Sequence, residues 1–328
     1  MRCFVTGGTG FLGRRVVRRL RERGDDVRVL VRDRSKAEEA EALGAEVIEG
    51  DLDRVEEFAG ALEGCDVVYH IGARVVSTGR WEEFLRTNVI ATAEIIDRGL
   101  EAGVRRIVYV GSLGIFEIPR NGVTITEESD YDHRPLLRGH YTRSKIDADR
   151  IATAAARTGK PVVIVRPGRI YGHDHPLQPL YMGRVKKRLG SRFLVVVGKP
   201  SYPAPIAYVE NAADAVVAAG TVPGIEGRAF NIVDDPDLTH AAYFRAMKGL
   251  DGCPSIVVHL PVGLFLPAVI AADAVHRVLR RRPWAVAYQL RRSGRNARYV
   301  TDAARQALGW TPRVSVPEAI RRTVEGRS

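Results

Sequence analysis

The sequence predicts a doubly wound α/β fold, in which a parallel sheet is accompanied by a smaller, mostly helical domain. Over the first 235 of 328 residues, short apolar runs alternate with amphipathic stretches, an order that builds parallel strands joined by right-handed crossovers. The apolar runs are rich in β-branched residues and do not alternate with polar ones, which indicates strands covered on both faces. From Pro236 onward, strand patterns become few.

Seven apolar runs are expected to form strands, namely residues 3–5, 27–31, 46–48, 67–70, 107–110, 162–165 and 229–233. Helical periodicity between them predicts helices over residues 11–23, 54–62, 81–101 and 142–156. The sheet domain should therefore consist of residues 1–167 and 207–235. Residues 168–206 and 236–328 should form the smaller domain over the carboxyl ends of the strands, where open α/β sheets bind ligands.

Composition is that of an ordinary globular chain, with 45% hydrophobic and 27% charged residues, which excludes a disordered or collagen-like protein and a membrane bundle. The three cysteines, Cys3, Cys65 and Cys253, are scattered and include no Cys-x-x-Cys pair. A disulfide framework or a cysteine-based zinc site is therefore not expected, and no metal site is predicted. The apolar start runs straight into glycines without a cleavable signal, so the expected location is the cytoplasm.

Positive charge is concentrated towards the end of the chain. The formal net charge is +11, and residues 236–328 hold 15 Arg and Lys against six Asp and Glu. Such a surface suits a phosphorylated substrate, an anionic membrane surface or nucleic acid, unless it is only an arginine-rich face in contact with solvent. The aromatic-plus-basic spacing of a nucleic-acid module is missing, so no nucleic-acid partner is expected.

The first motif with chemical meaning is the loop that begins at Thr6. Gly8, Gly10 and Gly13 form G-x-G-x-x-G directly after a predicted strand and at the start of a predicted helix. Glycines allow a tight turn and a close approach of the backbone to a pyrophosphate, whose charge the helix N-terminus favours. We therefore expect a dinucleotide here, the alternative being a turn that serves only packing. The expected contacts are Gly7, Gly10, Phe11 and Leu12.

The residues after the second and third strands bear on the choice of cofactor. Asp33 lies about 20 residues after Gly13, where an acidic residue binds the ribose 2′-hydroxyl of NAD. Arg32 directly follows the second strand, and a guanidinium there suits the 2′-phosphate of NADP. NADP is therefore favoured over NAD, unless these charges only decorate a loop. Asp51 and Leu52, after the third strand, are expected to lie beside the adenine ring of the cofactor.

A third pattern is the pair Tyr141 and Lys145, which are four residues apart on a predicted helix and so share one face. A nearby ammonium favours the phenolate, so Tyr141 can act as a general acid and base near neutral pH. Ser112 ends the fifth strand, where its hydroxyl can bond a substrate oxygen, although a serine that caps a loop is the simpler interpretation. His70 ends the fourth strand and is more readily a core histidine than a functional one.

Together these residues resemble the extended short-chain dehydrogenase/reductases, which have a Rossmann-type sheet. The resemblance spans most of the chain, through the glycine loop, Asp51-Leu52, Ser112, the Y-x-x-x-K pair, and Arg166-Pro167-Gly168 followed by Tyr171-Gly172. It implies a catalytic triad of Ser112, Tyr141 and Lys145. In that triad Tyr141 exchanges a proton with the substrate oxygen, Lys145 lowers the tyrosine pKa and holds the nicotinamide ribose, and Ser112 orients the reacting oxygen.

The same resemblance implies further features of the cofactor site and of the assembly. Pro167 and Gly168 would contact the cofactor, and Asn88 is a weaker candidate for support of the site. The chain would form a homodimer through two helices of the sheet domain.

Several reactions compete within this superfamily. Dehydratases place an Asp and a Glu directly after the catalytic Ser or Thr, whereas this chain has Leu113 and Gly114, which disfavours dehydration. The turn at residues 31–33 looks more like the dihydroflavonol reductases and 3β-hydroxysteroid dehydrogenases. We therefore expect an NADP(H)-dependent oxidoreductase that acts on a secondary alcohol or ketone of a small, fairly apolar substrate.

Two alternatives to that reaction stay open. One is a nucleotide-sugar epimerase with tightly held NAD, whose basic C-terminal region grips a diphosphate. The other, less favoured, is a nucleotide-binding sensor or scaffold without turnover.

The apolar stretch from His259 to Ala272 is too short and too interrupted by proline to span a membrane. It can line an apolar pocket, form an ordinary core helix of the smaller domain, or rest on a membrane surface with Arg277 and residues 280–282 towards the headgroups. The core helix is favoured, and contact with a membrane surface is the less favoured interpretation.

Overall fold

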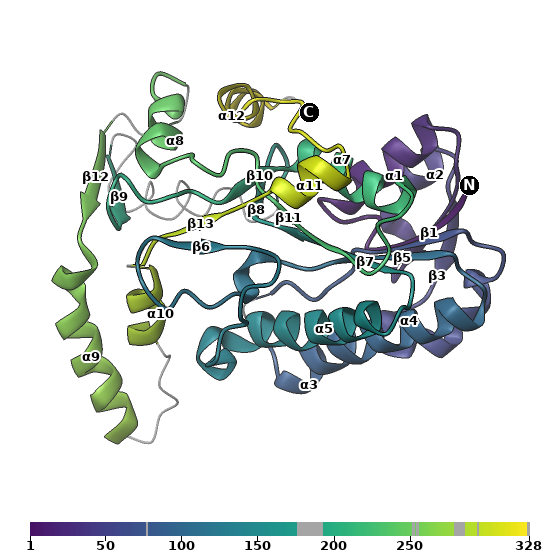
Figure 1. The fold of residues 1–328 in the computed structure, drawn as a ribbon, viewed down its shortest axis with the longest axis horizontal. Helices are drawn as coiled ribbons and strands as arrows, with labels where there is room; N and C mark the ends of the chain where they lie inside the picture. The colour runs from purple at the N-terminus through teal and green to yellow at the C-terminus, as the bar shows by residue number, and fades with distance from the viewer. Residues whose placement is uncertain are drawn as a thin grey trace.

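Seven strands form one sheet in the order β11-β7-β5-β4-β1-β2-β3, and every neighbouring pair is parallel (Figure 1). The strands are β1 (Arg2–Thr6), β2 (Asp26–Val31), β3 (Glu46–Glu49), β4 (Val67–His70), β5 (Arg106–Val110), β7 (Val162–Pro167) and β11 (Ala229–Ile232). This computed structural model describes residues 1–326 apart from residues 77, 176–192, 251–252, 254–255, 279–285 and 294. The predicted doubly wound fold is confirmed, and each predicted strand is found.

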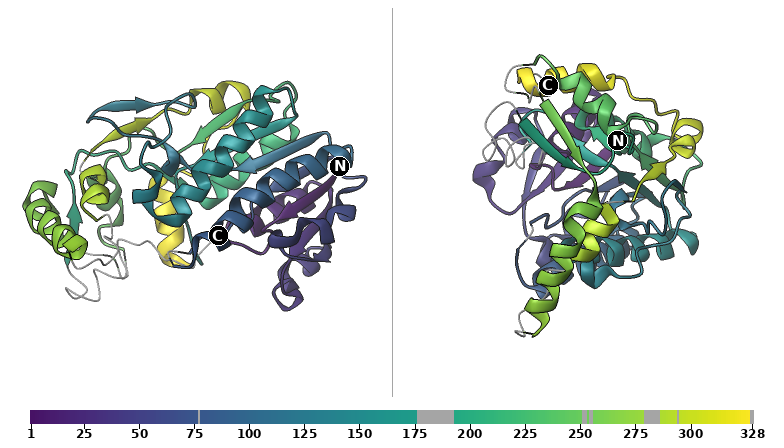
Figure 2. Two further views of the ribbon diagram at one scale, coloured as in Figure 1. Left: turned by 90° about the horizontal axis from the view of Figure 1, so that it is seen from below. Right: turned by 90° about the vertical axis from the view of Figure 1, so that its left-hand side faces the viewer.

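Helices cover both faces of the sheet, which is why its strands are continuous apolar runs. Leu20 and Val216 pack into the core on one face, and Ile95 and Ala152 pack into the core on the other. These side chains belong to α1 (Gly13–Glu22), α7 (Val209–Thr221), α4 (Ala91–Glu101) and α5 (Gly139–Arg157), respectively. Figures 1 and 2 show the sheet between the two helical layers.

Most predicted helices are found, with small changes at their ends. Residues 11–23 and 142–156 correspond to α1 and α5. Residues 81–101 form one helical stretch made of α3 (Trp81–Phe84), the π-helical turn η4 (Leu85–Ile90) and α4.

The helix predicted over residues 54–62 is wrong. Two short 3₁₀ turns replace it, η2 (Leu52–Glu57) and η3 (Ala59–Leu62). The backbone of Arg54 leaves the helical region, with φ −144° and ψ 66°. Val55 and Leu62 are nevertheless fully buried, so the apolar spacing that suggested a helix serves two turns instead.

Short strand pairs that the sequence did not predict join distant segments. β9 (Phe193–Val197) pairs with β12 (Ile256–Leu260), β8 (Arg169–Tyr171) with β10 (Ile206–Tyr208), and β6 (Val123–Ile125) with β13 (Ala297–Tyr299), each in parallel. The helices that accompany them are α8 (His240–Met247), α9 (Val262–Val278) and α10 (Val286–Ser293). The two segments expected to share the smaller domain therefore meet through β9 and β12.

The last two helices return to the sheet. They are α11 (Asp302–Ala307) and α12 (Val316–Glu325). Ala304, Leu308 and Trp310 are buried in the same core cluster as α1 and α7. Trp310 Nε1 also donates a hydrogen bond to the carbonyl oxygen of Asn211 on α7, at 2.9 Å.

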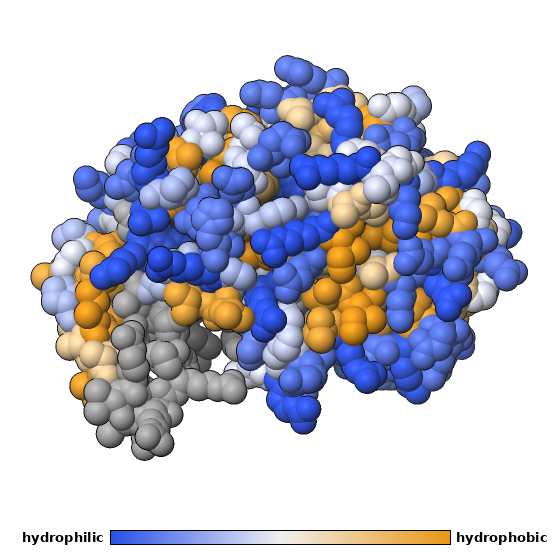
Figure 3. All heavy atoms as spheres, turned by 60° about the horizontal axis from the view of Figure 1, so that its bottom comes forward, coloured by the Kyte–Doolittle hydropathy of each residue, from blue (hydrophilic) through white to orange (hydrophobic). Residues whose placement is uncertain are grey.

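The apolar helix α9 projects from one end of the molecule (Figures 1 and 2). No α9 side chain whose burial is described lies in the core, and Leu264 and Val275 are 64% and 55% exposed. Figure 3 shows hydrophobic surface at this end. The prediction of an ordinary core helix is therefore wrong, because α9 packs mainly against α10 and is not enclosed between layers.

Two observations bear on contact with a membrane. No described helix is long and apolar enough to cross a bilayer. Residues 280–282, expected to face headgroups, fall outside the described residues.

Candidate active site

Between β1 and α1 the backbone makes a turn that leaves no room for a side chain at its glycines. Gly7 has a φ of +70°, and a Cβ on it would lie 2.7 Å from Gly72. A Cβ on Gly13 would lie 2.0 Å from the carbonyl oxygen of Gly7. No side chain caps the N-terminus of α1, which leaves that end of the helix able to bind an anion. The turn contains Gly7, Gly10, Phe11 and Leu12 and has the features that a dinucleotide pyrophosphate requires.

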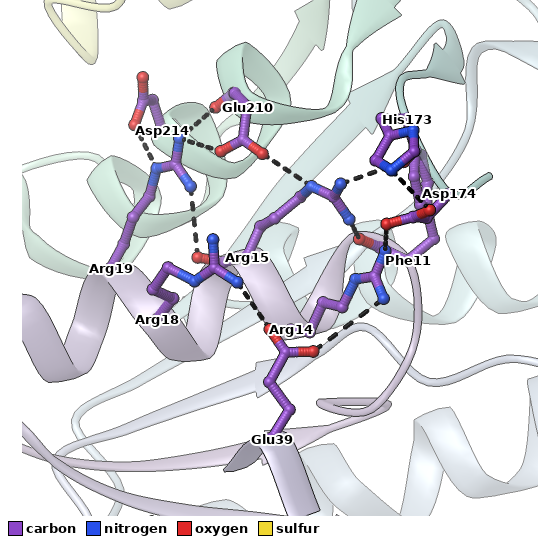
Figure 4. A network of polar contacts seen from close by, with 10 residues as sticks. All are labelled: Phe11, Arg14, Arg15, Arg18, Arg19, Glu39, His173, Asp174, Glu210 and Asp214. Atoms are coloured by element: carbon purple, nitrogen blue, oxygen red, sulfur yellow. Dashed lines mark hydrogen bonds and ion pairs between the residues drawn. The ribbon is translucent and has the colours of Figure 1, made fainter. Parts of the chain in front are cut away.

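Arginines of α1 fix this turn to α7 (Figure 4). Arg15 donates from Nη1 to the carbonyl oxygen of Phe11 at 2.8 Å and from Nε to Glu210 at 2.7 Å. Arg19 pairs with Glu210 and Asp214 at 2.7 and 2.6 Å. The Arg15 side chain is only 4% exposed, so its ion pair is shielded from solvent. Arg15 therefore connects the glycine turn to α7.

At the end of β2 the guanidinium and the carboxylate have different roles. Asp33 Oδ1 accepts hydrogen bonds from the N–H and the hydroxyl of Ser35 at 3.1 and 2.6 Å, and these bonds lower the pKa of the carboxyl. Arg32 is exposed and pairs with no carboxylate in the described part of the chain. Arg14 and Lys36 line a shallow pocket at the glycine turn. The Arg32 guanidinium is thus available to a ligand, whereas Oδ1 of Asp33 already accepts two hydrogen bonds from Ser35.

The remaining predicted cofactor contacts follow neighbouring strands. Asp51 follows β3 and caps the next turn by accepting a backbone N–H at 3.1 Å, and Leu52 is buried. Pro167 ends β7, and a Cβ on Gly168 would lie 2.6 Å from the carbonyl oxygen of Pro205. Because the carboxyl ends of parallel strands share one edge, the structure brings these residues to the edge that carries the glycine turn.

His70 is a core histidine. Its Nδ1 lies 2.8 Å from Oγ1 of Thr6, and its Nε2 lies 3.0 Å from Oγ1 of Thr92. Burial, aided by the charge of Lys145, lowers the pKa of His70 to about 3, so the ring is neutral at physiological pH. The favoured interpretation of this residue is confirmed.

Ser112 and the Lys145 ammonium both lie at the carboxyl end of β5. Lys145 Nζ donates a hydrogen bond to the carbonyl oxygen of Val110, two residues before Ser112, at 2.7 Å. Ser112 Oγ accepts the N–H of Gly114 at 3.1 Å, so the serine does cap its loop, and its own O–H remains available to a substrate oxygen. Tyr141 lies one helical turn before Lys145 on α5.

Burial sets the charge states of the Tyr141 and Lys145 side chains. It raises the pKa of Tyr141 to about 12 and, against the opposing charge of Asp149, lowers the pKa of Lys145 to about 8. Lys145 Nζ sits 4.6 Å from the ring centroid of Tyr109. The expected lowering of the phenol pKa is thus not found in the chain alone. At neutral pH the phenol is protonated, as a proton donor must be.

Asn88, the weaker candidate, connects the loop after β4 to α5. Its Nδ2 donates to Ser144 Oγ at 2.8 Å, and its Oδ1 accepts the N–H of Arg74 at 2.7 Å. Ser144 Oγ in turn donates to the carbonyl oxygen of Tyr141 at 2.8 Å. Asn88 lies in the π-helical turn η4, a distortion often found at functional sites. It therefore supports the start of the helix that carries Tyr141.

A buried ion pair beneath the site was not recognised from the sequence. Arg166 on β7 bonds Asp149 on α5 through two hydrogen bonds of 2.7 and 3.1 Å, and the two side chains are 2% and 0% exposed. Asp149 lies one turn after Lys145, so the four-residue spacing that singled out Tyr141 and Lys145 extends to it. The pair fixes α5 against the sheet.

Comparison with known families decides the assignment. The model of the NAD dependent epimerase/dehydratase family matches residues 3–232, more than half of the chain. The chain belongs to this family. It is an extended short-chain dehydrogenase/reductase, which is an enzyme of the NAD(P)-dependent oxidoreductase type.

Relatives within this superfamily are named as reductases and dehydrogenases. A 4-hydroxy-2-methyl-3-oxo-4-farnesyl-3,4-dihydroquinoline-1-oxide ketoreductase from Stigmatella aurantiaca is 29% identical over 319 residues, covering 96% of this chain and 93% of that protein. A 2-alkyl-3-oxoalkanoate reductase from Shewanella oneidensis is 28% identical and covers 98% and 84%. A decarboxylating sterol-4-alpha-carboxylate 3-dehydrogenase from Mus musculus is 26% identical and covers 99% and 90%.

Solved structures show the same architecture. The crystal structure of gox2253 has a TM-score of 0.84 at 25% identity, covering 99% of this chain and 97% of that one. A UDP-glucuronic acid 4-epimerase from Bacillus cereus in complex with NAD has a TM-score of 0.74 at 16% identity, covering 99% and 98%. At that identity the second likeness shows the fold alone.

Proposed function

We propose that this enzyme transfers hydride between NADP(H) and a secondary alcohol or ketone of a small, fairly apolar substrate. The observation that carries the proposal is that Lys145, on the same helix as Tyr141, bonds the end of β5 two residues before Ser112. A protonated phenol, a serine O–H and an ammonium at one edge of a nucleotide-binding sheet are what ketone reduction needs.

Each side chain has one task in the reduction. Tyr141 gives its phenol proton to the carbonyl oxygen, and the Ser112 O–H donates a second hydrogen bond to the same oxygen. Lys145 donates one of its three N–H groups to the carbonyl oxygen of Val110, and the other two can donate to a ribose hydroxyl. The hydride is what NADP(H) supplies when it is bound. Oxidation of the alcohol runs the same steps backwards, with Tyr141 as the proton acceptor.

NADP is the proposed nucleotide because the end of β2 offers a guanidinium. Arg32 is exposed, whereas Asp33 is engaged by Ser35. A 2′-phosphate would give the exposed Arg32 guanidinium an anionic partner, while a 2′-hydroxyl would need the Asp33 carboxylate, whose Oδ1 already accepts two hydrogen bonds from Ser35. The groups that would hold the rest of the cofactor are Gly7, Gly10, Phe11, Leu12, Asp51, Leu52, Pro167 and Gly168.

The apolar character of the substrate is supported by residues around the site. Val75 and Val76 follow β4 and are 58% and 45% exposed, and Leu136, which lies shortly before α5, is 72% exposed. Exposed aliphatic side chains after β4 and before the helix of Tyr141 suit a hydrocarbon surface. The relatives named above act, by their names, on farnesyl, alkyl and sterol compounds.

Replacement of the phenol tests the proposed chemistry. Tyr141→Phe should lower kcat by about a hundredfold or more, on the scale of one lost general acid, while NADPH binds nearly as before. The measurement follows NADPH absorbance with a panel of apolar ketones, and nucleotide affinity is titrated separately by fluorescence. Full turnover in the variant would contradict the mechanism.

The epimerase alternative is weakened by the way the C-terminal arginines pair. Three of them face carboxylates of their own chain and so are less available for a diphosphate, in the pairs Arg292–Asp132, Arg295–Glu117 and Arg298–Asp237. Mass spectrometry of the purified protein separates the two functions. NAD that stays bound through purification would favour the epimerase, and exchangeable NADP would favour the reductase.

A further inference from the structure

The turn formed by residues 113–116, directly after Ser112, is fixed by hydrogen bonds from residues outside it. Three consecutive carbonyl oxygens of this turn each accept a hydrogen bond. The donors are Arg138 Nη2 to Gly114 at 3.2 Å, the N–H of Asp132 to Ile115 at 2.8 Å, and Arg292 Nη2 to Phe116 at 2.7 Å. The N–H of Gly114 is in turn the group that bonds Ser112 Oγ. The orientation of the serine hydroxyl therefore depends on a turn whose position other residues hold.

The donors share one buried carboxylate. The Asp132 side chain is 0% exposed, and it accepts hydrogen bonds from Arg138 Nη1 at 2.6 Å and from the Tyr288 hydroxyl at 2.7 Å, with Arg292 Nη1 at 3.7 Å. Burial opposes its ionisation, but the hydrogen bonds from Tyr288, the Arg134 N–H and Arg138 outweigh burial and keep the pKa of Asp132 below its ordinary value. We refer to Asp132, Arg138, Tyr288 and Arg292 as the Asp132 cluster.

The Asp132 cluster joins three parts of the chain. Tyr288 lies 156 residues after Asp132 and belongs, with Arg292, to α10, which packs against α9. Arg138 ends the 3₁₀ turn η6 (Pro135–Arg138) and leads directly into α5. The serine turn, the start of the helix that carries Tyr141, and α10 are thus linked through one carboxylate.

We propose that the Asp132 cluster is a positioning device through which α10 sets the orientation of the Ser112 hydroxyl. The proposal rests on the proposed function for the role of Ser112. Arg292 and Tyr288 act through the serine turn and do not transfer a proton themselves. Charge-assisted hydrogen bonds between buried partners are strong enough to fix a turn, and small displacements of a reacting group lower rates steeply.

The first test needs no turnover. Amide hydrogen exchange is compared for peptides that span residues 112–117 in the natural protein, in Arg292→Gln and in Tyr288→Phe. Loss of the Arg292 or Tyr288 contact should loosen the turn and speed exchange of the Gly114 amide by about tenfold, the factor expected for one lost hydrogen bond. Arg291→Gln is the matched control, because Arg291 is an exposed arginine on the same helix outside the cluster.

The outcome of this test is decisive in either direction. Faster exchange in both cluster variants but not in the control supports the coupling of α10 to the serine turn. Unchanged exchange in both cluster variants overturns it. Tyr288→Phe removes only one hydroxyl, so it keeps the test available if Arg292→Gln does not fold.

The second test asks whether the cluster acts through the serine. With NADPH and ethyl α-methylacetoacetate as the probe, Arg292→Gln should lower kcat about tenfold and leave KM and NADPH affinity nearly unchanged. In a Ser112→Ala background the same substitution should have almost no further effect, because there is no hydroxyl left to orient. Arg292→Lys, which keeps the charge and one donor, should recover part of the rate.

If Arg292→Gln lowers kcat equally in the natural protein and in the Ser112→Ala variant, Arg292 has only a structural role. Failure of the proposed function has a different signature, namely turnover that survives both Tyr141→Phe and Ser112→Ala, or no reduction of any ketone by NADPH. In that case the exchange experiment still decides whether α10 holds the serine turn.

Discussion

At the scale of single residues, nucleotide choice depends on Arg32. Arg32→Ala should weaken binding of NADPH by about tenfold to a hundredfold, the range expected for one lost charge-assisted hydrogen bond, and leave binding of NADH nearly unchanged. Fluorescence titration with both nucleotides measures the difference. Arg34→Ala is the control, because Arg34 is 66% exposed and pairs with Glu41. An equal loss for both nucleotides would refute the assignment of the 2′-phosphate to Arg32.

Lys145 predicts how ketone reduction depends on pH. Its pKa is lowered to about 8, chiefly by burial, while that of Tyr141 is raised to about 12. Below about pH 8 the ammonium is charged and the phenol is protonated, so kcat/KM should be high. As pH rises through the pKa of Lys145 the ammonium is lost, and kcat/KM should fall before Tyr141 ionises. A rate that stays flat well above pH 8 would show that the charge of Lys145 is dispensable.

The candidate catalytic residues could be predicted from the sequence where they lie close together along the chain. Tyr141 and Lys145 are one helical turn apart, so their relation is visible in the sequence. The role of Asn88 is not visible in a local motif, because its partner Ser144 lies 56 residues away. Asp132 was missed altogether, since Tyr288 lies 156 residues beyond it and only the fold brings them together.

At the scale of elements, the junction of β1 and α1 is a part of the site where the backbone leaves no room for an added side chain. Gly13→Ala would force a Cβ to within 2.0 Å of the carbonyl oxygen of Gly7. The free energy of unfolding should fall by about 1–3 kcal/mol, the usual cost of overpacking, and nucleotide binding should be lost because the turn must open. Urea denaturation and nucleotide titration measure the two effects.

Gly60→Ala is the control for that substitution, since a Cβ on Gly60 would meet nothing within 4 Å. Similar losses of stability in both variants would mean that the close approach at Gly13 does not matter.

Elements of the sheet were predictable because buried strands and long amphipathic helices have strong periodic patterns. The exceptions are physical. Residues 54–62 have a helical apolar spacing but form two 3₁₀ turns, since Val55 and Leu62 reach the core without a continuous helix. β6, β8, β10 and β13 are three residues long each, too short for any period to appear.

At the scale of the whole molecule, the C-terminal segment closes the core of the sheet. Trp310 is 3% exposed and is bonded to Asn211. Trp310→Ala should lower the free energy of unfolding by about 3–5 kcal/mol, the typical loss for a buried aromatic residue, whereas Trp310→Phe, which removes the N–H but keeps a ring, should lose less. Chemical denaturation of both variants checks the order, and equal stability of the alanine variant and the natural protein would contradict it.

The chain leaves the sheet after β11 and rejoins the same core at α11. The described part of the chain between those two points is anchored at both ends, and it also pairs with β9 through β12 and with β6 through β13. We expect that such a segment can be exchanged for that of a relative without breaking the nucleotide-binding sheet if two conditions hold. The incoming segment must keep the strand pairs with β9 and β6, and its α10 must still supply a tyrosine and an arginine to Asp132. Substrate preference could then be transferred between enzymes together with this segment, as long as those contacts are kept.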